Sequence, residues 1–199
     1  MYKKIVCSTF CFFLVFALCT GCNKTIDVAE IIGTEKMNVE NYRATFVIDE
    51  SDIVAVTTYA SYVFVADVVK YDKTEYLNDD VDTPITYYSV RVKDNIKGYL
   101  RDDEDIVLKK AGGLRRGTDT FLVCAGDILP EPGKTYLFAA VIFEDDLYCP
   151  MPNMVAEVED CSKLENSEII QKYIDACGKE APDVINGKNY KSKYDAEVQ

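Results

Sequence analysis

The segment from Ile85 to Ile96 contains a run, residues 88–93, in which apolar and polar side chains alternate strictly. Tyr88, Val90 and Val92 would point to one face, and the residues between them, such as Arg91, would point to the other. A period of two over this length is typical of a strand in an antiparallel sheet that is buried on one face only. The pattern therefore predicts a half-buried β-sheet.

Further strand-like segments lie at short spacing and are separated by strong turn signals. Gly112-Gly113 and the "PEPG" stretch at 130–133 are signals of this kind. The expected strands cover residues 62–71, 85–96, 106–108, 118–125, 135–143, 147–149 and 154–158. Several short strands with turns between them predict a small barrel or sandwich.

Two helices are expected beside the strands. Ser51 or Asp52 can cap a short helix that runs to about Ala60, although the β-branched residues there also suit a strand. Residues 166–177 have a helical period, and Gly178 is expected to end that helix. Its expected apolar face consists of Ile169, Ile170, Tyr173, Ile174 and Cys177.

The N-terminus has the layout of an export signal. Lys3 and Lys4 precede an apolar run from Ile5 to Leu18, and two small residues then precede Cys22. The run is about 14 residues long, which is short of the ~20 residues that span a bilayer as a helix. The small pair before a cysteine resembles the lipobox of bacterial lipoproteins. This resemblance implies that Cys22 carries diacylglycerol and becomes the mature N-terminus.

Ordinary secretory cleavage nearby, which would leave Cys22 as a free or paired thiol, is the alternative. We prefer lipidation, because the apolar run ends right at Cys22. Two acyl chains on one residue give stable membrane attachment. The expected location is extracytoplasmic, with the chain anchored to a bacterial cell membrane through Cys22. The expected segments are a signal peptide (1–21), a tether (22–45), a β-domain (46–160), a C-terminal helix (161–178) and a polar, mobile tail (179–199).

Residues 51–149 resemble a domain that is found in many bacterial surface lipoproteins. The resemblance rests on a strand at 63–69, "YSVRVKDNIKG" at 88–98, Gly112-Gly113 and "PGKTYLF" at 132–138. That domain is similar in layout to netrin-like and metalloproteinase-inhibitor modules, which are OB-type barrels. The resemblance implies a mostly β fold: a small OB-like antiparallel β-barrel with a short helix before it and an amphipathic helix after it. The inhibitors act through a free N-terminal cysteine, so their mechanism does not transfer to an acylated Cys22.

The charge balance excludes some partners. Removal of residues 1–21 leaves 178 residues with 20 basic and 34 acidic side chains, a net charge of −14. Such acidity argues against nucleic acid, because phosphate binding depends on clustered lysine and arginine. It also argues against adhesion to anionic lipid headgroups. The expected partners are the membrane, through the lipid anchor, and a surface protein or small ligand.

The chain contains no histidine. This excludes Ser-His-Asp and Cys-His catalysis and zinc sites built on histidine. No pair of cysteines after Cys22 has the C-x-x-C spacing of a metal site. We therefore expect neither an enzyme nor a bound cofactor.

Four cysteines follow the signal region: Cys124, Cys149, Cys161 and Cys177. An even number outside the cytoplasm permits disulfides. A bridge from Cys161 to Cys177 is disfavoured, because the intervening helix rises ~16 Å while bridged Cα atoms lie within ~7 Å. It would need residues 161–166 to fold back along the helix. The other pairings stay open, as do free thiols.

Two charged loops are candidate ion sites. Asp79, Asp80 and Asp82 offer carboxylate oxygens that suit calcium, but the loop lacks the glycine and closing glutamate of an EF-hand. Arg115 and Arg116 lie in a glycine-bounded loop and can hold a carboxylate or phosphate. For both loops, side chains that are simply solvated are the preferred interpretation.

Aromatic residues are abundant, with 14 tyrosines and 9 phenylalanines but no tryptophan. Exposed strand tyrosines can stack on a sugar or peptide, whereas packing with the ring inward is the more common role. The absence of tryptophan argues against a carbohydrate module. We expect a non-catalytic binding or interaction module, which an exposed aromatic patch would favour. The alternative, which a protruding rigid loop would favour, is an inhibitor or modulator of a cell-surface enzyme such as a protease.

Overall fold

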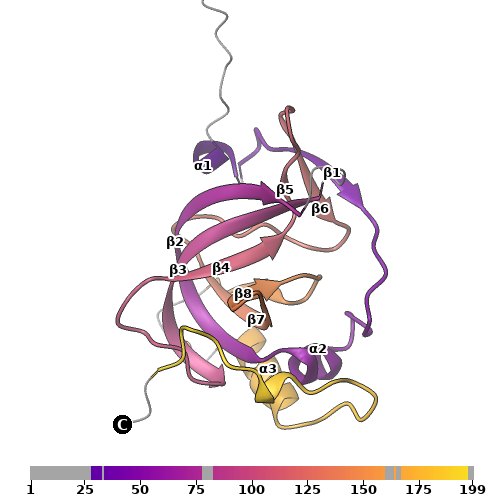
Figure 1. Cartoon of the computed structure of the whole chain (residues 1–199), viewed down its shortest axis with the longest axis vertical. Coiled ribbons are helices and arrows are strands. Elements are labelled where there is room, and N and C mark those ends of the chain that lie inside the picture. The colour runs from indigo at the N-terminus through magenta and orange to yellow at the C-terminus, as the bar shows by residue number, and fades with distance from the viewer. Residues whose placement is uncertain (1–27, 33, 78–82, 160–163, 165–166, 197–199) are drawn as a thin grey trace, which may run out of the picture.

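The structure is a computed structural model of the chain, and it describes residues 28–32, 34–77, 83–159, 164 and 167–196. The described part is mostly β, with short helices at its two ends, as Figure 1 shows. This composition confirms the mostly β class that the sequence predicted.

The main sheet has six strands in the order β2-β3-β4-β8-β7-β9, and β2 also pairs with β7, so that the sheet curls into a partial ring. Its strands are β2 (Tyr62–Tyr76), β3 (Pro84–Lys97), β4 (Ile106–Ala111), β7 (Thr135–Phe143), β8 (Asp146–Cys149) and β9 (Val155–Glu157). The pairings are antiparallel except between β4 and β8, which run parallel. The expected antiparallel arrangement is wrong at this pair, because the chain leaves β4 and returns beside it only after β7.

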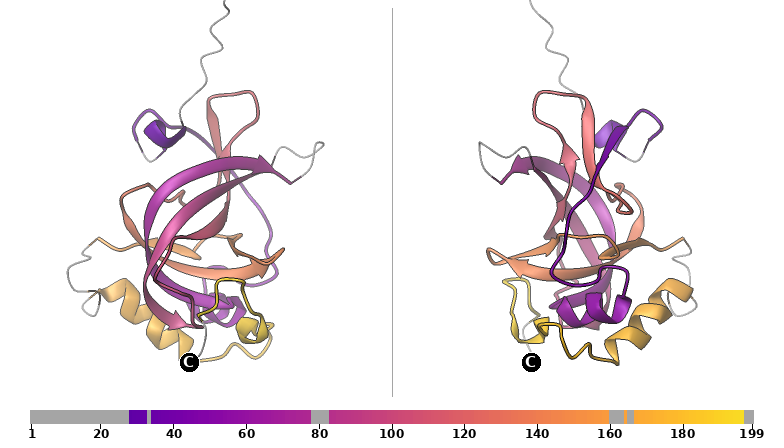
Figure 2. Two further views of the ribbon diagram at one scale, coloured as in Figure 1. Left: turned by 60° about the vertical axis from the view of Figure 1, so that its left-hand side comes forward. Right: turned by 90° about the vertical axis from the view of Figure 1, so that its right-hand side faces the viewer.

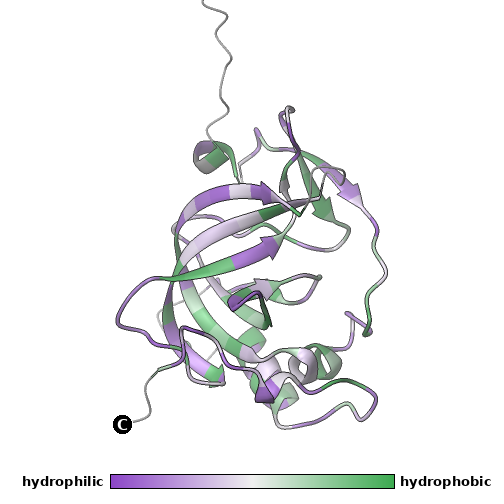
Figure 3. Ribbon diagram, viewed as in Figure 1, coloured by the Kyte–Doolittle hydropathy of each residue, from purple (hydrophilic) through white to green (hydrophobic). Residues whose placement is uncertain are grey.

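The alternating segment forms β3, as predicted. Tyr88 and Val90 are fully buried, while Arg91 between Val90 and Val92 is exposed. Its partner β2 is longer than expected and changes character along its length, from hydrophobic to hydrophilic (Figure 3). The β2–β3 register is irregular at several positions, and such bulges bend and twist a strand. The bent β2–β3 hairpin can therefore form part of the ring at one end and extend past the ring at the other end.

A second, small sheet contains β1 (Asn38–Tyr42), β6 (Thr120–Cys124) and β5 (Gly113–Leu114) in the order β1-β6-β5. The β1 and β6 strands are parallel. Upstream, α1 (Val28–Ile31) contacts β2, and its Val28 belongs to the hydrophobic core. Both α1 and β1 fall within the expected tether of residues 22–45, so this part of the tether packs against the domain.

The two expected helices are present. The first, α2 (Ile53–Tyr59), begins after Asp52, whose side chain accepts a hydrogen bond from the Val54 N–H at 2.9 Å. The second, α3 (Glu168–Cys177), contacts α2 at one end of the ring (Figure 2). None of the helices in the described part is long and apolar enough to cross a membrane.

The apolar face of α3 differs slightly from the expected one. Ile170 and Tyr173 are buried as predicted, and Ala176 is buried with them. Ile174 is 42% exposed, so its expected place on the buried face is wrong. The contact with α2 selects the side of the helix that carries the small Ala176.

Residues 179–196, which we name the C-terminal strap, pack against the sheet and α2. The Ala181 N–H donates to Thr58 Oγ1 at 3.1 Å, and the Ser192 N–H donates to the Tyr62 hydroxyl at 2.8 Å. Leu100 and Asp195 form an antiparallel bridge. The mobile tail expected over 179–199 is therefore corrected within the described part, because backbone hydrogen bonds hold this polar segment in place.

Candidate functional site

A groove of about 360 Å³ opens between the β7–β8 hairpin, the end of α2 and the C-terminal strap. We name it the aromatic groove, because four of its lining residues are Tyr59, Phe143, Tyr148 and Tyr190. Ligand pockets in proteins have volumes of roughly 300–1,000 Å³. The aromatic groove therefore has room for part of a ligand.

The β7–β8 hairpin places two of these rings side by side. Val141 pairs directly with Tyr148, and Phe143 lies two residues beyond Val141, so all three share one face of the hairpin. The rings of Phe143 and Tyr148 have centroids 5.6 Å apart. Phe143 is 38% exposed, which leaves part of this ring pair open to solvent.

The turn between β7 and β8 has the backbone conformation of a tight two-residue hairpin. Phe143 pairs with Asp146, so the turn consists of Glu144 and Asp145, both at positive φ. A positive φ at both turn residues matches the twist of the flanking strands in two-residue hairpins. The tight turn keeps Phe143 at the rim of the groove.

The strap supplies the opposite wall, through Ile185 and Tyr190, which are 72% and 57% exposed. Gly187 lies so close to α2 that an added Cβ would be 2.3 Å from the Tyr59 carbonyl oxygen. Only glycine permits this approach without a shift of the backbone. The contact fixes the wall of the groove against Tyr59.

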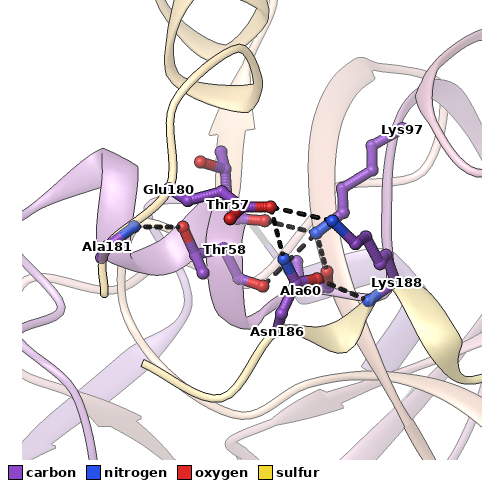
Figure 4. A network of polar contacts seen from close by, with 8 residues as sticks. All are labelled: Thr57, Thr58, Ala60, Lys97, Glu180, Ala181, Asn186 and Lys188. Atoms are coloured by element: carbon purple, nitrogen blue, oxygen red, sulfur yellow. Dashed lines mark hydrogen bonds and ion pairs between the residues drawn. The ribbon is translucent and has the colours of Figure 1, made fainter. Parts of the chain in front are cut away.

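Polar contacts join α2 to β3 and brace the strap beside it, and the Ala181 N–H bond to Thr58 links the strap to α2 (Figure 4). The Lys97 ammonium donates to the carbonyl oxygens of Thr57 at 2.8 Å and Ala60 at 2.6 Å, which lie at the C-terminal end of α2. Burial lowers the pKa of Lys97 from its ordinary value. In the strap, Glu180 accepts hydrogen bonds from Asn186 at 3.0 Å and Lys188 at 2.8 Å. These contacts position the strap residues that line the groove.

The hydroxyl groups of the groove have no hydrogen-bond partner in the described part of the chain. Among the described residues, none accepts from or donates to the hydroxyls of Tyr59, Ser61, Tyr148 or Tyr190. Burial, with the nearby acidic groups, raises the pKa of Tyr148 to about 12, so its hydroxyl is protonated at neutral pH. The groove therefore offers hydroxyl donors and acceptors to a ligand.

The lining of the groove is otherwise apolar and uncharged. Val141, Ile142, Pro150 and Ile185 supply its aliphatic part, and no charged side chain is among the lining residues of the described chain. The described lining therefore consists of aromatic rings, aliphatic side chains and hydroxyl groups. Its chemistry suits binding.

Charged groups in the interior have a different role. Lys110 and Asp127 form an ion pair whose side chains are 0% and 1% exposed. Lys110 shares the inward face of β4 with Ile106 and Leu108, as a period of two requires. The pair ties the loop between β6 and β7 to the interior of the ring.

Of the residues predicted as sites from the sequence, the structure describes the two arginines and three of the cysteines. Arg115 forms a 2.9 Å ion pair with Glu40, and the Arg116 guanidinium lies 4.4 Å from the centre of the Tyr76 ring. An anion contact at these arginines stays a prediction. The calcium candidates, Asp79, Asp80 and Asp82, lie outside the described residues, as does the lipidation candidate Cys22.

The cysteines in the described part are free thiols: Cys124, Cys149 and Cys177. Burial raises the pKa of Cys149 to about 12, and burial also raises the pKa of Cys124 and Cys177. A protonated, buried thiol is a poor nucleophile. Cys161 lies outside the described residues, and a search of the described part finds no cluster of three or more acidic or cysteine ligands that could hold a metal.

The sequence placed Tyr148 in an expected strand, 147–149, but did not predict the groove. Tyr59 was assigned to a helix without a role, and Tyr190 was assigned to a mobile tail. The signal that could have found the wall is the Asn186-Gly187 pair, a turn dipeptide in an otherwise charged segment. The scan against protein-family models and the search of curated proteins each found no match to this chain.

Proposed function

We propose that this chain is a membrane-anchored bacterial lipoprotein whose domain is a non-catalytic extracytoplasmic binding module, with the aromatic groove as its binding site. The observation that carries the proposal is the groove itself. It combines partly exposed aromatic rings, hydroxyl groups without partners in the described chain and a lining free of charge. Exposed apolar patches of this kind mark interaction sites.

The barrel interpretation is supported by the strand pairing. Because β2 pairs with both β3 and β7, the hydrogen bonds of the main sheet run from β2 through β4 and β8 back to β2. We propose that this ring is a small OB-like barrel. OB folds present one surface to ligands on a rigid scaffold, and the hairpin that carries Phe143 and Tyr148 belongs to the ring.

The placement of the groove suits an anchored protein. In Figures 1 and 2, α1 lies at one end of the molecule, and α2, α3 and the strap lie at the other. Cys22 is six residues before Val28, a stretch that reaches about 20 Å at most. A lipid on Cys22 would therefore hold the α1 end near the membrane, with the groove directed away from it.

The proposal can be tested by photo-crosslinking in intact bacterial cells. Tyr190 is replaced by p-benzoylphenylalanine, and the same replacement at Tyr99, which is 75% exposed and lies outside the groove, serves as the control. We expect a crosslinked adduct from position 190 that fractionates with membranes, and none from position 99. The adduct should leave the membrane fraction when Cys22→Ala is added. Equal adducts from both positions would contradict the binding site, and an unchanged fraction for Cys22→Ala would contradict the anchor.

A further inference from the structure

The charge of the groove and of the whole protein disfavours an anionic ligand. The groove offers no lysine or arginine to a phosphate or carboxylate, and no carboxylate to a cation. The chain itself carries a net charge of −12. A field of that sign disfavours nucleic acids and acidic polysaccharides as partners.

The groove presents hydroxyl groups beside aromatic faces. Phe143 and Tyr148 form a ring pair at one wall, while Tyr59 and Tyr190 add rings with hydroxyls that have no partner in the described chain. A pyranose ring has the complementary shape, with an apolar C–H face and a rim of hydroxyls that both donate and accept. Tyrosine provides both kinds of contact in one side chain.

The groove is open rather than enclosed, because Ile185 and Tyr190 on its outer wall are largely exposed. An open groove admits one or two units of an extended chain, whereas a small apolar molecule is better held by an enclosed pocket. A proline-rich peptide also lies in aromatic grooves. It offers carbonyl acceptors but few donors, and so leaves the acceptor capacity of the four hydroxyls unused.

We propose that the aromatic groove binds an uncharged glycan chain, with one sugar ring lying on the Phe143–Tyr148 ring pair and sugar hydroxyls bonded to Tyr190 and Tyr59. This inference rests on the groove being the binding site proposed above, and it names the chemical class of the ligand. The lack of tryptophan argued against a carbohydrate module, but the groove gathers one phenylalanine and three tyrosine rings that would serve in its place.

Electrophoresis of the full-length protein in detergent, through native gels that each contain one polysaccharide, tests the proposal. The neutral probes are starch, mannan, xyloglucan and mixed-linkage β-glucan, and polygalacturonate is the acidic control. We expect at least one neutral gel to retard the protein, and polygalacturonate not to do so. Phe143→Ala should weaken the retarding interaction about tenfold or more, because it removes the stacking surface.

Tyr190→Phe provides the second variant, since it keeps the ring and removes only the hydroxyl at an exposed position that folding does not depend on. We expect a loss of about fivefold, the factor of one neutral hydrogen bond. Tyr99→Phe, an exposed tyrosine outside the groove, should behave as wild type. The proposal is overturned if no neutral gel retards the protein, if retardation survives Phe143→Ala, or if Tyr190→Phe matches the control.

A fluorescent proline-rich decapeptide, followed by anisotropy, separates this inference from the function on which it rests. If the peptide binds, Phe143→Ala abolishes that binding and no polysaccharide retards the protein, the glycan is wrong and the binding module stands. If neither probe binds and position 190 gives no crosslinked adduct, both proposals are wrong.

Discussion

Tyrosine residues lie both in the interior of the protein and in the aromatic groove, but their hydroxyl groups have different surroundings. In the interior, Tyr62 donates to Asp195 and accepts from the Ser192 N–H, and Tyr136 accepts from the Glu131 N–H at 3.1 Å. The hydroxyls of Tyr148 and Tyr190 in the groove have no such partner in the described chain. Buried polar groups need partners, whereas groove hydroxyls can bond to water until a ligand replaces it.

The two regions also differ in charge. The interior contains the fully buried ion pair of Lys110 and Asp127, while the groove has no charged lining residue. A buried charge is tolerated only when it is paired. The interior groups therefore act in folding, and the groove groups are available for binding. Substitutions that remove polar atoms should separate these roles.

The largest effect is expected from the buried ion pair. Asp127→Ala leaves the Lys110 ammonium buried without its counter-ion, which should lower the free energy of unfolding by about 3–5 kcal/mol. Urea denaturation measures this loss. The double variant Lys110→Met with Asp127→Leu is the control and should recover most of it, since an apolar pair of similar volume replaces the charges. A single variant that unfolds like wild type would contradict a structural role for the pair.

A smaller effect should distinguish the two groups of tyrosines directly. Tyr62→Phe removes the hydroxyl that bonds to Asp195 and to the Ser192 N–H, and should cost about 1.5–3 kcal/mol because one partner is charged. The matched change in the groove, Tyr148→Phe, removes a hydroxyl without a partner and should change stability by no more than about 0.5 kcal/mol. Thermal unfolding of the two proteins gives the comparison. Similar losses would mean that the groove hydroxyl has a structural bond.

The strap should be sensitive at its point of closest approach. Gly187→Ala places a Cβ 2.3 Å from the Tyr59 carbonyl oxygen, and the forced shift should cost about 1–3 kcal/mol. Gly178→Ala is the control, because its Cβ would have no neighbour nearer than 3.6 Å and its φ of −74° suits alanine. Limited proteolysis of the strap should be faster for Gly187→Ala alone. Equal proteolysis of the two variants would argue against a strap that depends on this contact.

Local features of the fold were predictable from the sequence. The period of two in β3 and the Asp52 cap of α2 each depend on residues close together in the chain, so the pattern contains the whole signal. The parallel pairing of β4 with β8 depends on segments about 40 residues apart, and no local pattern encodes it. The apolar face of α3 was displaced by its contact with α2, which leaves Ile174 exposed.

The groove was less predictable than the sheet, because one of its walls, formed by Ile185, Gly187 and Tyr190, comes from the strap. The polar composition of residues 179–199 predicted a mobile tail. Polar composition predicts mobility correctly where the backbone forms no hydrogen bonds with the rest of the protein. Here the partners belong to a distant element, α2: the Ala181 N–H donates to the Thr58 hydroxyl, and Gly187 packs on the Tyr59 carbonyl. These contacts depend on the small size of Gly187 and on how the chain brings the strap against α2. They do not depend on hydrophobic side chains. Tyr190 was missed for that reason.

Tyr88 is the exception to the rule that interior tyrosines have partners, and it gives the smallest expected effect. Its hydroxyl is fully buried and has no hydrogen-bond partner among the described residues. An unsatisfied buried hydroxyl costs folding free energy, so Tyr88→Phe should raise stability by about 1 kcal/mol instead of lowering it. Urea denaturation of Tyr88→Phe and Tyr62→Phe measures the same chemical change at two buried positions. The changes in the free energy of unfolding should have opposite signs. A loss of stability in Tyr88→Phe would show that a bound water or another group forms a hydrogen bond with this hydroxyl. Tyr88 would then follow the same rule as Tyr62 and Tyr136, whose buried hydroxyls have partners, unlike the hydroxyls of the groove.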